Sequence, residues 1–392
     1  MEPVYIVSAV RTPIGKFGGS LLDFTAADLG VIAARAAMER AGVKPEQVEE
    51  TIFGNGRQAG GGPNVARQIG YRSGVPESAP AYTINMACAS GLKCIALGSE
   101  DIALGNADCV LAGGTESMSR LPYFLENARW GFRMGDQKLV DAMYRDGFMD
   151  PLSKMLMGET AEKLAGLYKI TREEQDCFGQ SSQLRAEAAT TQGLFKEEII
   201  PIEVKEKKGT RQFDSDEHIR FGCTIESMKK LPPVFSKTGT VTAGNSSGIT
   251  DGAAATVLVS GRKVKEWGLK PIARLVDYSQ VGVDPSIMGI GPVPAVRKLE
   301  AKTGWKLEDY DLIELNEAFA AQVLACDRDL HFNPDKLNVH GGAIALGHPI
   351  GCTGTRLIVT LLHALKQRGG QRGLATLCVS GGLGMAMAVE MV

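Results

Sequence analysis

The stretch AGVKPEQVEETIFGN, residues 41–55, recurs in altered form as TGWKLEDYDLIELNE, residues 303–317. In both stretches a helix pattern stops at a glycine, a short acidic turn follows, and a strand pattern begins. A second pair of segments, VLAGG (110–114) and CVSGG (378–382), follows in the same order and at nearly the same spacing. Chance similarity is a poor explanation for two matched pairs of segments that follow each other in the same order. The sequence therefore predicts two copies of one unit.

Strand and helix patterns alternate along both copies, which is typical of an α/β protein. Residues 4–10 (VYIVSAV) predict a strand, and residues 25–42 have the apolar spacing of a helix. Residues 119–248 fit neither copy, because they are rich in Met, Arg and Lys and carry charged loops such as KEKKGTRQFDSDEHIR. We therefore expect an N-terminal half formed by residues 1–118 and 249–271, an inserted loop domain at 119–248, and a C-terminal half at 272–392.

The composition argues against several classes of protein. The 392 residues carry a formal net charge of −2, and no basic cluster predicts a nucleic-acid or membrane surface. We find no apolar run long enough for a transmembrane helix, and the N-terminus lacks the pattern of a signal peptide. The eight cysteines are scattered without a C-x-x-C pair, which favours reduced thiols in the cytoplasm over disulfides or a zinc site. No H-x-x-x-H motif or carboxylate cluster predicts another metal.

The segment INMACASGLKCIALG, residues 84–98, sets Cys88 between a strand and a helix that begins near Ala89. The thiolate is the nucleophilic form of cysteine, and a helix N-terminus lowers the pKa of a thiol. Position alone fits a small buried core residue equally well, since free cysteines are often buried. Cys94 and Cys109 fall within apolar periodicity, and we expect both in the core.

Two further glycine-framed segments carry a reactive side chain each. His348 lies in NVHGGAIALGHPIGCTGTR (338–356), where Pro349 restricts its backbone to an extended conformation and flanking glycines leave the ring approachable. A histidine near a cysteine can take its proton and activate it. Cys378 lies in LATLCVSGGLG (374–384), in the other copy from Cys88. Two cysteines with one histidine suggest one nucleophile and one separate acid or base, unlike a cysteine protease.

Two other motifs allow more than one interpretation. Asn316, in ELNEAFAAQ, is either the N-cap of a helix or an amide that positions a water or a substrate oxygen. The segment GNGRQA (54–59) follows a strand and matches the dinucleotide pattern G-x-G-x-x-A. This match is weak, because three glycines and a proline follow it instead of a helix.

Five motifs together resemble the thiolase family: NMACASG, AGGTESMS, NEAFAAQ, NVHGGAIALGHPIGCTG and GLATLCVSGG. The likeness runs from Val4 to Glu390, and the spacing and the insertion are most similar to the acetyl-CoA acetyltransferases of that family. The resemblance implies a five-layered α-β-α-β-α fold built from two similar halves, with a loop domain that covers coenzyme A. It also implies a homotetramer. The repeat supports the two similar halves independently.

The resemblance also implies the role of each reactive residue. Cys88 would attack a thioester carbonyl and hold the acyl group, with His348 as its base, and Cys378 would move the α-proton. Asn316 would hold a water that, with His348, stabilises the enolate oxygen, and the N–H groups of Cys88 and Ser380 would form a second oxyanion site. The substrates would be acetyl-CoA, acetoacetyl-CoA and CoA, in ping-pong kinetics and without a cofactor.

Two groups of binding residues follow from the same resemblance. Coenzyme A is expected against Arg220 at its charged adenosine end, Ser227 and Leu231 at the adenine, and Ala243 and Ser247 along the pantetheine tunnel. The acyl end is expected to be walled by Met157, Met288 and Phe319. Without a substrate, Arg220 would be a solvated charge and the three apolar residues plain core packing.

Several positions depart from the family pattern. Leu156 stands where the biosynthetic enzymes often have histidine, and Phe148 replaces a usual leucine at the same wall. Ser380 replaces a glycine, so its oxyanion role requires a φ that suits a non-glycine residue. His340 stands where asparagine is usual, as a second histidine near the site, and Ala89 replaces a frequent glycine. These changes leave thiolase chemistry intact and bear on the acyl chain length.

Four functions are compatible with these motifs to different degrees. The first is an acetyl-CoA C-acetyltransferase, favoured because Met157 and Met288 would close the acyl pocket. The second is a 3-ketoacyl-CoA thiolase of fatty-acid degradation with a broader chain-length range. A ketoacyl synthase would use two histidines with one cysteine, and Cys378 argues against it. A non-enzymatic, thiolase-like lipid carrier should have lost part of the reactive set, which is complete here.

Overall fold

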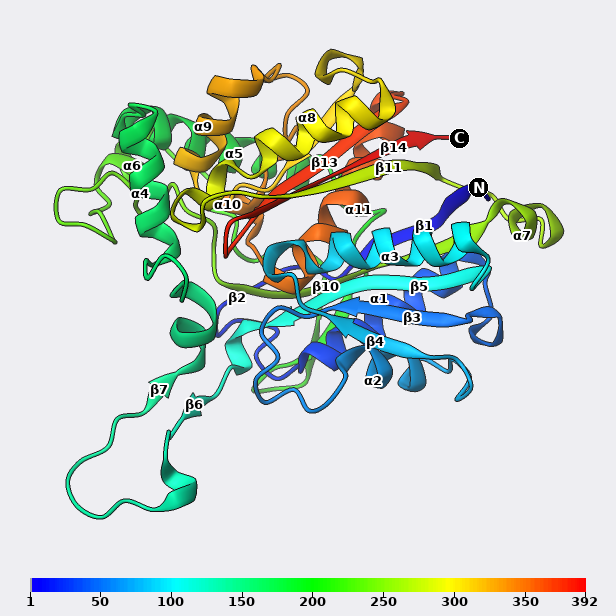
Figure 1. Ribbon diagram of the computed structural model, residues 1–392, viewed down its shortest axis with the longest axis horizontal. Helices are drawn as coiled ribbons and strands as arrows, with labels where there is room; N and C mark the ends of the chain where they lie inside the picture. The colour runs from blue at the N-terminus through cyan, green and yellow to red at the C-terminus, as the bar shows by residue number, and fades with distance from the viewer. Residues whose placement is uncertain (1) are drawn as a thin grey trace.

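The computed structural model describes residues 2–392 and is organised around one ten-stranded sheet (Figure 1). The short strand β2 (Gly15–Lys16) pairs with β10, and the other strands follow in the order β12 (Leu312–Leu315), β13 (Arg372–Val379), β14 (Leu383–Met391), β11 (Ala273–Gly282), β1 (Val4–Arg11), β10 (Thr250–Ser260), β5 (Cys109–Ser117), β3 (Glu50–Gly54) and β4 (Ala81–Ile84). β3 is parallel to β4 and β5, and β12 is parallel to β13.

The sheet contains the predicted repeat. β1, β3, β5 and β10 correspond, in chain order and in their position in the sheet, to β11, β12, β13 and β14. The two halves meet where β1 pairs with β11, through Tyr5 opposite Arg274 and Ile6 opposite Ala273. In each half a helix ends at a left-handed glycine before the repeated strand, at Gly42 with φ 66° and at Gly304 with φ 76°. The prediction of two copies is therefore confirmed.

Helices cover both outer faces of the sheet and fill the space between its halves. α1 (Ala26–Ala41) and α2 (Val65–Arg72) pack on the first half, and α8 (Pro292–Thr303), beside α9 (Ala320–Leu330), packs on β11 and β14. α3 (Ser90–Leu104) and α11 (Ile350–Arg368) contact each other in the middle, with α3 on β5 and α11 on β13 (Figure 1). This is the predicted order of layers, α-β-α-β-α.

The alternation of side chains along a strand separates these layers. In β5, Cys109 and Leu111 join the apolar cluster of α1, whereas Val110 and Ala112 join the cluster between the two halves. Successive residues of a strand point to opposite faces, so one buried strand supplies two cores. Cys94 lies in the central cluster, and both Cys94 and Cys109 are fully buried, as predicted.

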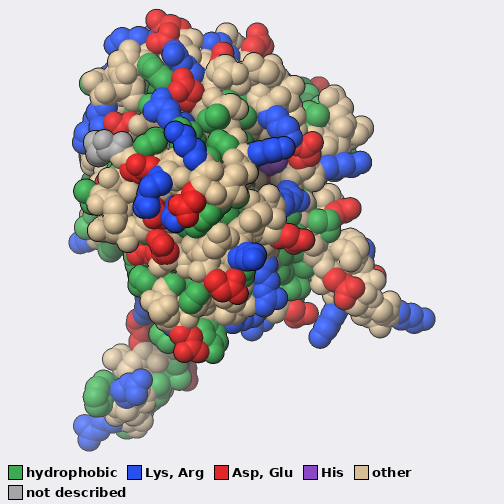
Figure 2. Space-filling view, turned by 90° about the vertical axis from the view of Figure 1, so that its right-hand side faces the viewer, with side chains coloured by type: hydrophobic (Ala, Val, Ile, Leu, Met, Phe, Trp, Pro, Cys, Tyr) green, Lys and Arg blue, Asp and Glu red, His purple; other side chains and the backbone are tan. Residues whose placement is uncertain are grey.

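Residues between β5 and β10 form the inserted region. Its elements are η3 (Met118–Arg120), β6 (Tyr123–Phe124), η4 (Ala128–Trp130), β7 (Val140–Asp141), the π-helical turn η5 (Tyr144–Phe148), α4 (Met157–Leu167), α5 (Arg172–Thr191), β8 (Ile202–Lys205), β9 (Thr210–Phe213) and α6 (Ile225–Lys229). The β6–β7 hairpin projects from the body (Figure 1) and presents hydrophobic and basic side chains at the bottom of Figure 2.

Short elements complete the chain. They are η1 (Pro45–Gln47), η2 (Ala87–Ala89), α7 (Gly261–Glu266), η6 (Pro285–Ile290), η7 (Leu307–Asp309) and α10 (Ala343–Leu346). Of the helices formed by residues 2–392, none combines the length and the apolar character needed to cross a membrane.

A buried ion-pair network fastens the inserted region to the sheet. Arg11, on β1, is fully buried. Its Nε donates to Glu198 Oε1 over 2.6 Å, and its two terminal nitrogens donate to the Asp216 carboxylate over 2.7 and 2.9 Å. Both carboxylates belong to the inserted region, so one guanidinium ties that region to the strand at the centre of the fold.

We expect Arg11→Met to lower the free energy of unfolding by about 3–5 kcal/mol, because two buried carboxylates lose their partner. Arg211 pairs with Glu206 on the surface, where both side chains are about half exposed. Arg211→Met should therefore change the free energy of unfolding by less than about 1 kcal/mol. Urea denaturation followed by circular dichroism measures both values. Equal effects of the two substitutions would contradict the proposed anchoring role of Arg11.

Candidate active site

Cys88 lies at the junction that the sequence predicts, between the end of β4 and the first turn of α3. The preceding Ala87 has φ 44°, in the left-handed region that non-glycine residues rarely adopt. Ser90 holds this turn, because its Oγ donates to the Ala87 carbonyl over 2.6 Å and accepts from the Met86 N–H over 2.9 Å. Hydrogen bonds of Ser90 to Met86 and Ala87 therefore fix the turn that holds the Cys88 side chain at the start of the helix.

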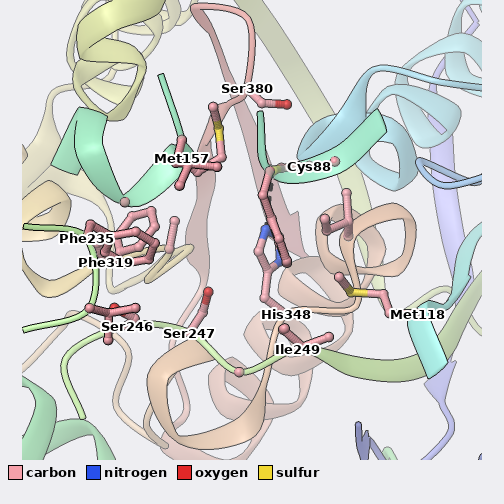
Figure 3. A pocket seen from close by; sticks show the side chains of 18 of the residues that line it. Cys88, Met118, Met157, Phe235, Ser246, Ser247, Ile249, Phe319, His348 and Ser380 are labelled. Carbon is pink, nitrogen blue, oxygen red and sulfur yellow. Dashed lines mark hydrogen bonds between the residues drawn. The ribbon is translucent and has the colours of Figure 1, made fainter. Parts of the chain in front are cut away.

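His348 is oriented so that one ring nitrogen faces this cysteine. Its Nε2 lies 3.2 Å from Cys88 Sγ (Figure 3). Its Nδ1 lies 2.6 Å from Thr353 Oγ1. The Thr353 hydroxyl donates its own proton to the Pro349 carbonyl over 3.0 Å. Thr353 Oγ1 therefore accepts from Nδ1–H, which leaves the lone pair of Nε2 directed at the Cys88 thiol.

Burial makes both members of this pair neutral. It raises the pKa of Cys88 above its ordinary value of about 9, against the opposing effects of Arg57 and of the N–H groups of Ser380 and Cys88 itself. Burial, together with Arg356 and Arg57, lowers the pKa of His348 to about 3. The expectation that the helix N-terminus lowers the pKa of Cys88 is wrong for the free protein, because the loss of solvation outweighs the helix field.

Asn316 is fully buried at the end of β12, with its Nδ2 3.5 Å from His348 Nε2. Its Oδ1 has no hydrogen-bond partner among residues 2–392. The N-cap interpretation is wrong, because α9 begins only at Ala320 and Phe319 occupies its N-cap. A buried amide with a free acceptor beside the histidine suits a water or a polar ligand atom.

Cys378 and Ser380 lie at the end of β13, in the same cavity wall as Cys88. Cys378 is fully buried, and burial, followed by the proximity of Cys88, raises the pKa of its thiol well above the ordinary value. Ser380 does not have a positive φ, since Gly381 and Gly382 take the left-handed positions of the turn. The replacement of glycine by Ser380 therefore leaves its N–H available near the Cys88 sulfur.

Cys88, His348, Cys378 and Ser380 line one mostly apolar cavity of about 350 Å³, whereas Asn316 is not one of its lining residues. In Figure 3, Cys88 and His348 lie in its middle, with Met157 and Phe319 on one side and Met118 on the other. The predicted acyl-wall residues Met157, Met288 and Phe319 all line it, as do the predicted pantetheine contacts Ala243 and Ser247. The departures Leu156 and Phe148 also line it.

The residues predicted at the adenine end lie outside the cavity, along its Ala243 rim. Arg220 donates from Nη2 to the Ala243 carbonyl over 3.1 Å, and the Leu231 side chain packs against the neighbouring Gly244. Ser227 is exposed on α6, where its hydroxyl donates to the Thr224 carbonyl over 2.6 Å. The three side chains thus lie on the surface beyond the cavity mouth.

Two results differ from the sequence-based expectations. His340 is not a second histidine of the site, because it packs edge-on against Phe195 at 5.8 Å and is not a cavity-lining residue. Sequence reasoning also missed lining residues, among them Arg57, Met118, Tyr144 and Phe235. The only signal for Arg57 in the sequence is the GNGRQA segment, whose pattern indicates a nucleotide motif and not a cavity-lining arginine.

Comparison with known proteins agrees with this architecture. Residues 4–262 match the family described as thiolase, N-terminal domain, and residues 269–391 match thiolase, C-terminal domain. The chain belongs to the thiolase family. An acetyl-CoA acetyltransferase of Cupriavidus necator is 52% identical over 391 residues, covering 100% of both chains, and one of Syntrophomonas wolfei is 51% identical, covering 99% of this thiolase and 98% of the relative.

Solved thiolase structures superpose closely on this fold. The acetyl-CoA acetyltransferase of Bacillus anthracis has a TM-score of 0.98 at 46% identity and covers 100% of this chain and 99% of its own. Human mitochondrial 3-ketoacyl-CoA thiolase gives the same TM-score, identity and coverage. The similarity of the fold therefore does not separate the two activities.

The neutral Cys88–His348 pair predicts how this thiolase reacts with iodoacetamide. The alkylation rate of Cys88 should rise about tenfold per pH unit between pH 6 and 9, because only the thiolate reacts and the pKa of the thiol lies above that range. Peptide mass spectrometry separates Cys88 from the exposed Cys177, which serves as the internal control. A rate plateau reached below pH 7 would instead show a preformed thiolate–imidazolium pair.

Proposed function

We propose that this thiolase is an acetyl-CoA C-acetyltransferase, which interconverts two molecules of acetyl-CoA with acetoacetyl-CoA and CoA. The observation that carries the proposal is the 3.2 Å contact between Cys88 Sγ and His348 Nε2 in a cavity that also contains Cys378. Relatives about half identical over their full length are named acetyl-CoA acetyltransferase, which supports the short-chain reaction.

In the first half-reaction, His348 Nε2 accepts the Cys88 proton while Cys88 Sγ attacks the acetyl-CoA carbonyl. The resulting oxyanion accepts hydrogen bonds from the N–H groups of Cys88 and Ser380. Each such donor contributes about 10²–10³-fold to the rate of comparable acyl transfers. The tetrahedral species releases CoA as a thiolate, which takes the proton of Cys378 and leaves an acetyl-Cys88 thioester, a protonated His348 and a Cys378 thiolate.

In the second half-reaction, Cys378 takes a proton from the α-carbon of a second acetyl-CoA. The enolate oxygen that forms is stabilised by protonated His348 and by a water held at Asn316 Oδ1, which has no hydrogen-bond partner among residues 2–392. The α-carbon attacks the acetyl carbonyl, the bond to Cys88 Sγ breaks, and the departing Cys88 thiolate takes the proton of His348. Acetoacetyl-CoA then leaves, and both cysteines are thiols again. Two half-reactions that share one acyl-cysteine give ping-pong kinetics, and none of these steps uses a cofactor.

The inserted region would cover coenzyme A. The pantetheine arm would enter along Ala243 and Ser247, which line the cavity, with the adenosine end near Arg220, Ser227 and Leu231 on the surface. The half-buried cation Arg220 suits the negative charge of the phosphates. Met157, Met288 and Phe319 would then enclose the acyl end.

The assembly and the compartment are part of the same proposal. A homotetramer is supported by the projecting β6–β7 hairpin, on which Trp130 is 85% and Met134 is 90% exposed. Large exposed apolar side chains on one segment are typical of an interaction surface. A reducing compartment such as the cytoplasm is supported by the eight cysteines, all free in the described chain.

Thiolysis of two ketoacyl substrates tests the proposed function. If Met157 and Met288 close the acyl pocket, kcat/KM for acetoacetyl-CoA should be about 10- to 100-fold higher than for 3-ketooctanoyl-CoA, since added methylenes overpack a closed pocket. Loss of the ketoacyl absorbance with free CoA follows both reactions. Comparable rates would favour a broader 3-ketoacyl-CoA thiolase, and no turnover of either substrate would favour a non-enzymatic carrier.

A further inference from the structure

The carboxylate of Glu116 lies where three segments that build the site meet. Glu116 is near the end of β5 and is fully buried. Its Oε2 accepts from the Gly56 N–H over 3.0 Å and from the Gly351 N–H over 2.8 Å. Its Oε1 accepts from Asn55 Nδ2 over 2.6 Å and from the Arg57 N–H over 3.1 Å. One side chain of β5 therefore holds both the loop after β3 and the start of α11.

These contacts indicate that Glu116 is an ionised carboxylate. Every hydrogen-bond partner is an N–H donor, so both oxygens accept and neither faces an acceptor for a proton of its own. Burial raises the pKa of Glu116, whereas the nearby Arg57 guanidinium and the N–H groups of Gly351, Arg57 and Gly56 lower it. Gly351 is in the first turn of α11, where unpaired N–H groups and the helix field favour an anion.

Glu116 is connected to the turn that carries Cys88. The carbonyl of Gly56 accepts from Asn85 Nδ2 over 3.1 Å, and Asn85 Oδ1 accepts from the Ala87 N–H over 3.0 Å. Ala87 has the left-handed φ of 44° and immediately precedes Cys88. Two hydrogen bonds therefore join the residue that Glu116 holds to the strained turn before the nucleophile.

Glu116 also fixes the start of the helix that follows His348. Gly351 comes three residues after His348, and its N–H cannot be satisfied within α11. The backbone here is closely packed, since a Cβ on Gly351 would lie 2.5 Å from the Thr115 carbonyl oxygen and 2.8 Å from the Gly56 nitrogen. The same carboxylate oxygen thus binds Gly56, on the Cys88 side, and Gly351, on the His348 side.

We propose that Glu116 is a positioning residue of the thiolase reaction, whose carboxylate sets the separation between Cys88 Sγ and His348 Nε2. This inference rests on the proposed function. Glu116 does not line the cavity, so it acts through Gly56 and Gly351 and not on the substrate. The proton passes from Cys88 to His348 across a 3.2 Å contact, and a misplacement of about 1 Å can lower a rate about 10²-fold.

The charge and the hydrogen bonds of Glu116 have opposite effects on Cys88. Among the groups near Cys88, the charge of Glu116 raises the pKa of the thiol and Arg57 lowers it, while His348 and Cys378 are neutral thiol neighbours in the free protein. Removal of the charge should therefore favour the thiolate. Removal of the hydrogen bonds should slow attack on a thioester, because His348 is no longer held opposite the sulfur.

The substitution Glu116→Gln tests the proposal, with Asp216→Asn as its matched control. Asp216 is also a buried carboxylate beside a buried arginine, and it accepts from the Ile14 N–H over 2.8 Å, but it does not line the cavity. We expect Glu116→Gln to slow the formation of acetyl-Cys88 from acetyl-CoA about 10²-fold. The same variant should react faster than wild type with iodoacetamide at Cys88 at neutral pH. Asp216→Asn should leave both rates near those of wild type.

Quenched-flow mixing followed by peptide mass spectrometry measures both rates and also the alkylation of Cys94. Cys94 is fully buried, so its alkylation would report a loss of folding. In that case the test rests on Glu116→Asp, which keeps the charge but is one methylene shorter. Glu116→Asp should slow acetylation of Cys88 while its alkylation stays near the wild-type rate.

Two results would overturn the inference: acetylation near the wild-type rate in both Glu116 variants, or an equal fall in Asp216→Asn. A slower alkylation of Cys88 in Glu116→Gln would also contradict it, because the charge would then not act as described. Wild-type acetylation is measured beside the variants. Its absence would contradict the proposed function, whereas its presence with unaffected Glu116 variants would contradict this inference alone.

Discussion

The close contact between α3 and α11 is the constraint on which the site depends. A Cβ on Gly91 would lie 2.5 Å from Thr355 Oγ1, and a Cβ on Gly354 would collide with the backbone of Leu92. Only glycine at these positions lets the two helices approach so closely. They are equivalent helices of the two repeated halves, and both begin at the cavity. Their contact therefore brings Cys88, before one helix, to His348, before the other.

The buried setting of this pair determines its chemistry. Without substrate, the thiol and the imidazole are both neutral, since burial disfavours each charged form. In the proposed reaction, this pair becomes charged only when Cys88 loses its proton to His348 during attack. In the proposed reaction, the N–H groups of Cys88 and Ser380 then act on the oxyanion, where fixed donors in a mostly apolar cavity are most effective. The site is organised for a charge that exists only during the reaction.

Much of this arrangement could be predicted from the sequence, because it depends on residues that are close together in the chain. The helix patterns that end at Gly42 and Gly304 predicted the repeat. The glycines near Cys88, His348 and Cys378 indicated which three side chains could react. Features that depend on packing were not predictable. The state of the Cys88 thiol depends on burial, and the N-cap alternative for Asn316 is wrong because α9 begins only at Ala320, with Phe319 as its N-cap.

Arg57 illustrates the same limit most clearly. Its motif suggests a phosphate loop, and only the parallel pairing of β3 with β5 brings it to Glu116 and into the cavity. Similarly, the sequence set His340 beside His348 in a shared motif, but the fold turns His340 toward Phe195. Neighbours in the chain are therefore poor guides to which side chains share a cavity.

The most direct test of the account is to find where the acetyl group resides. The enzyme is mixed with acetyl-CoA, quenched in acid within milliseconds, digested, and examined by peptide mass spectrometry. We predict one acetyl group per chain, on the peptide that contains Cys88, and its loss in a His348→Ala variant at neutral pH. An acetyl group on Cys378, or an acetyl-Cys88 that forms at an unchanged rate without His348, would contradict the central role of this pair.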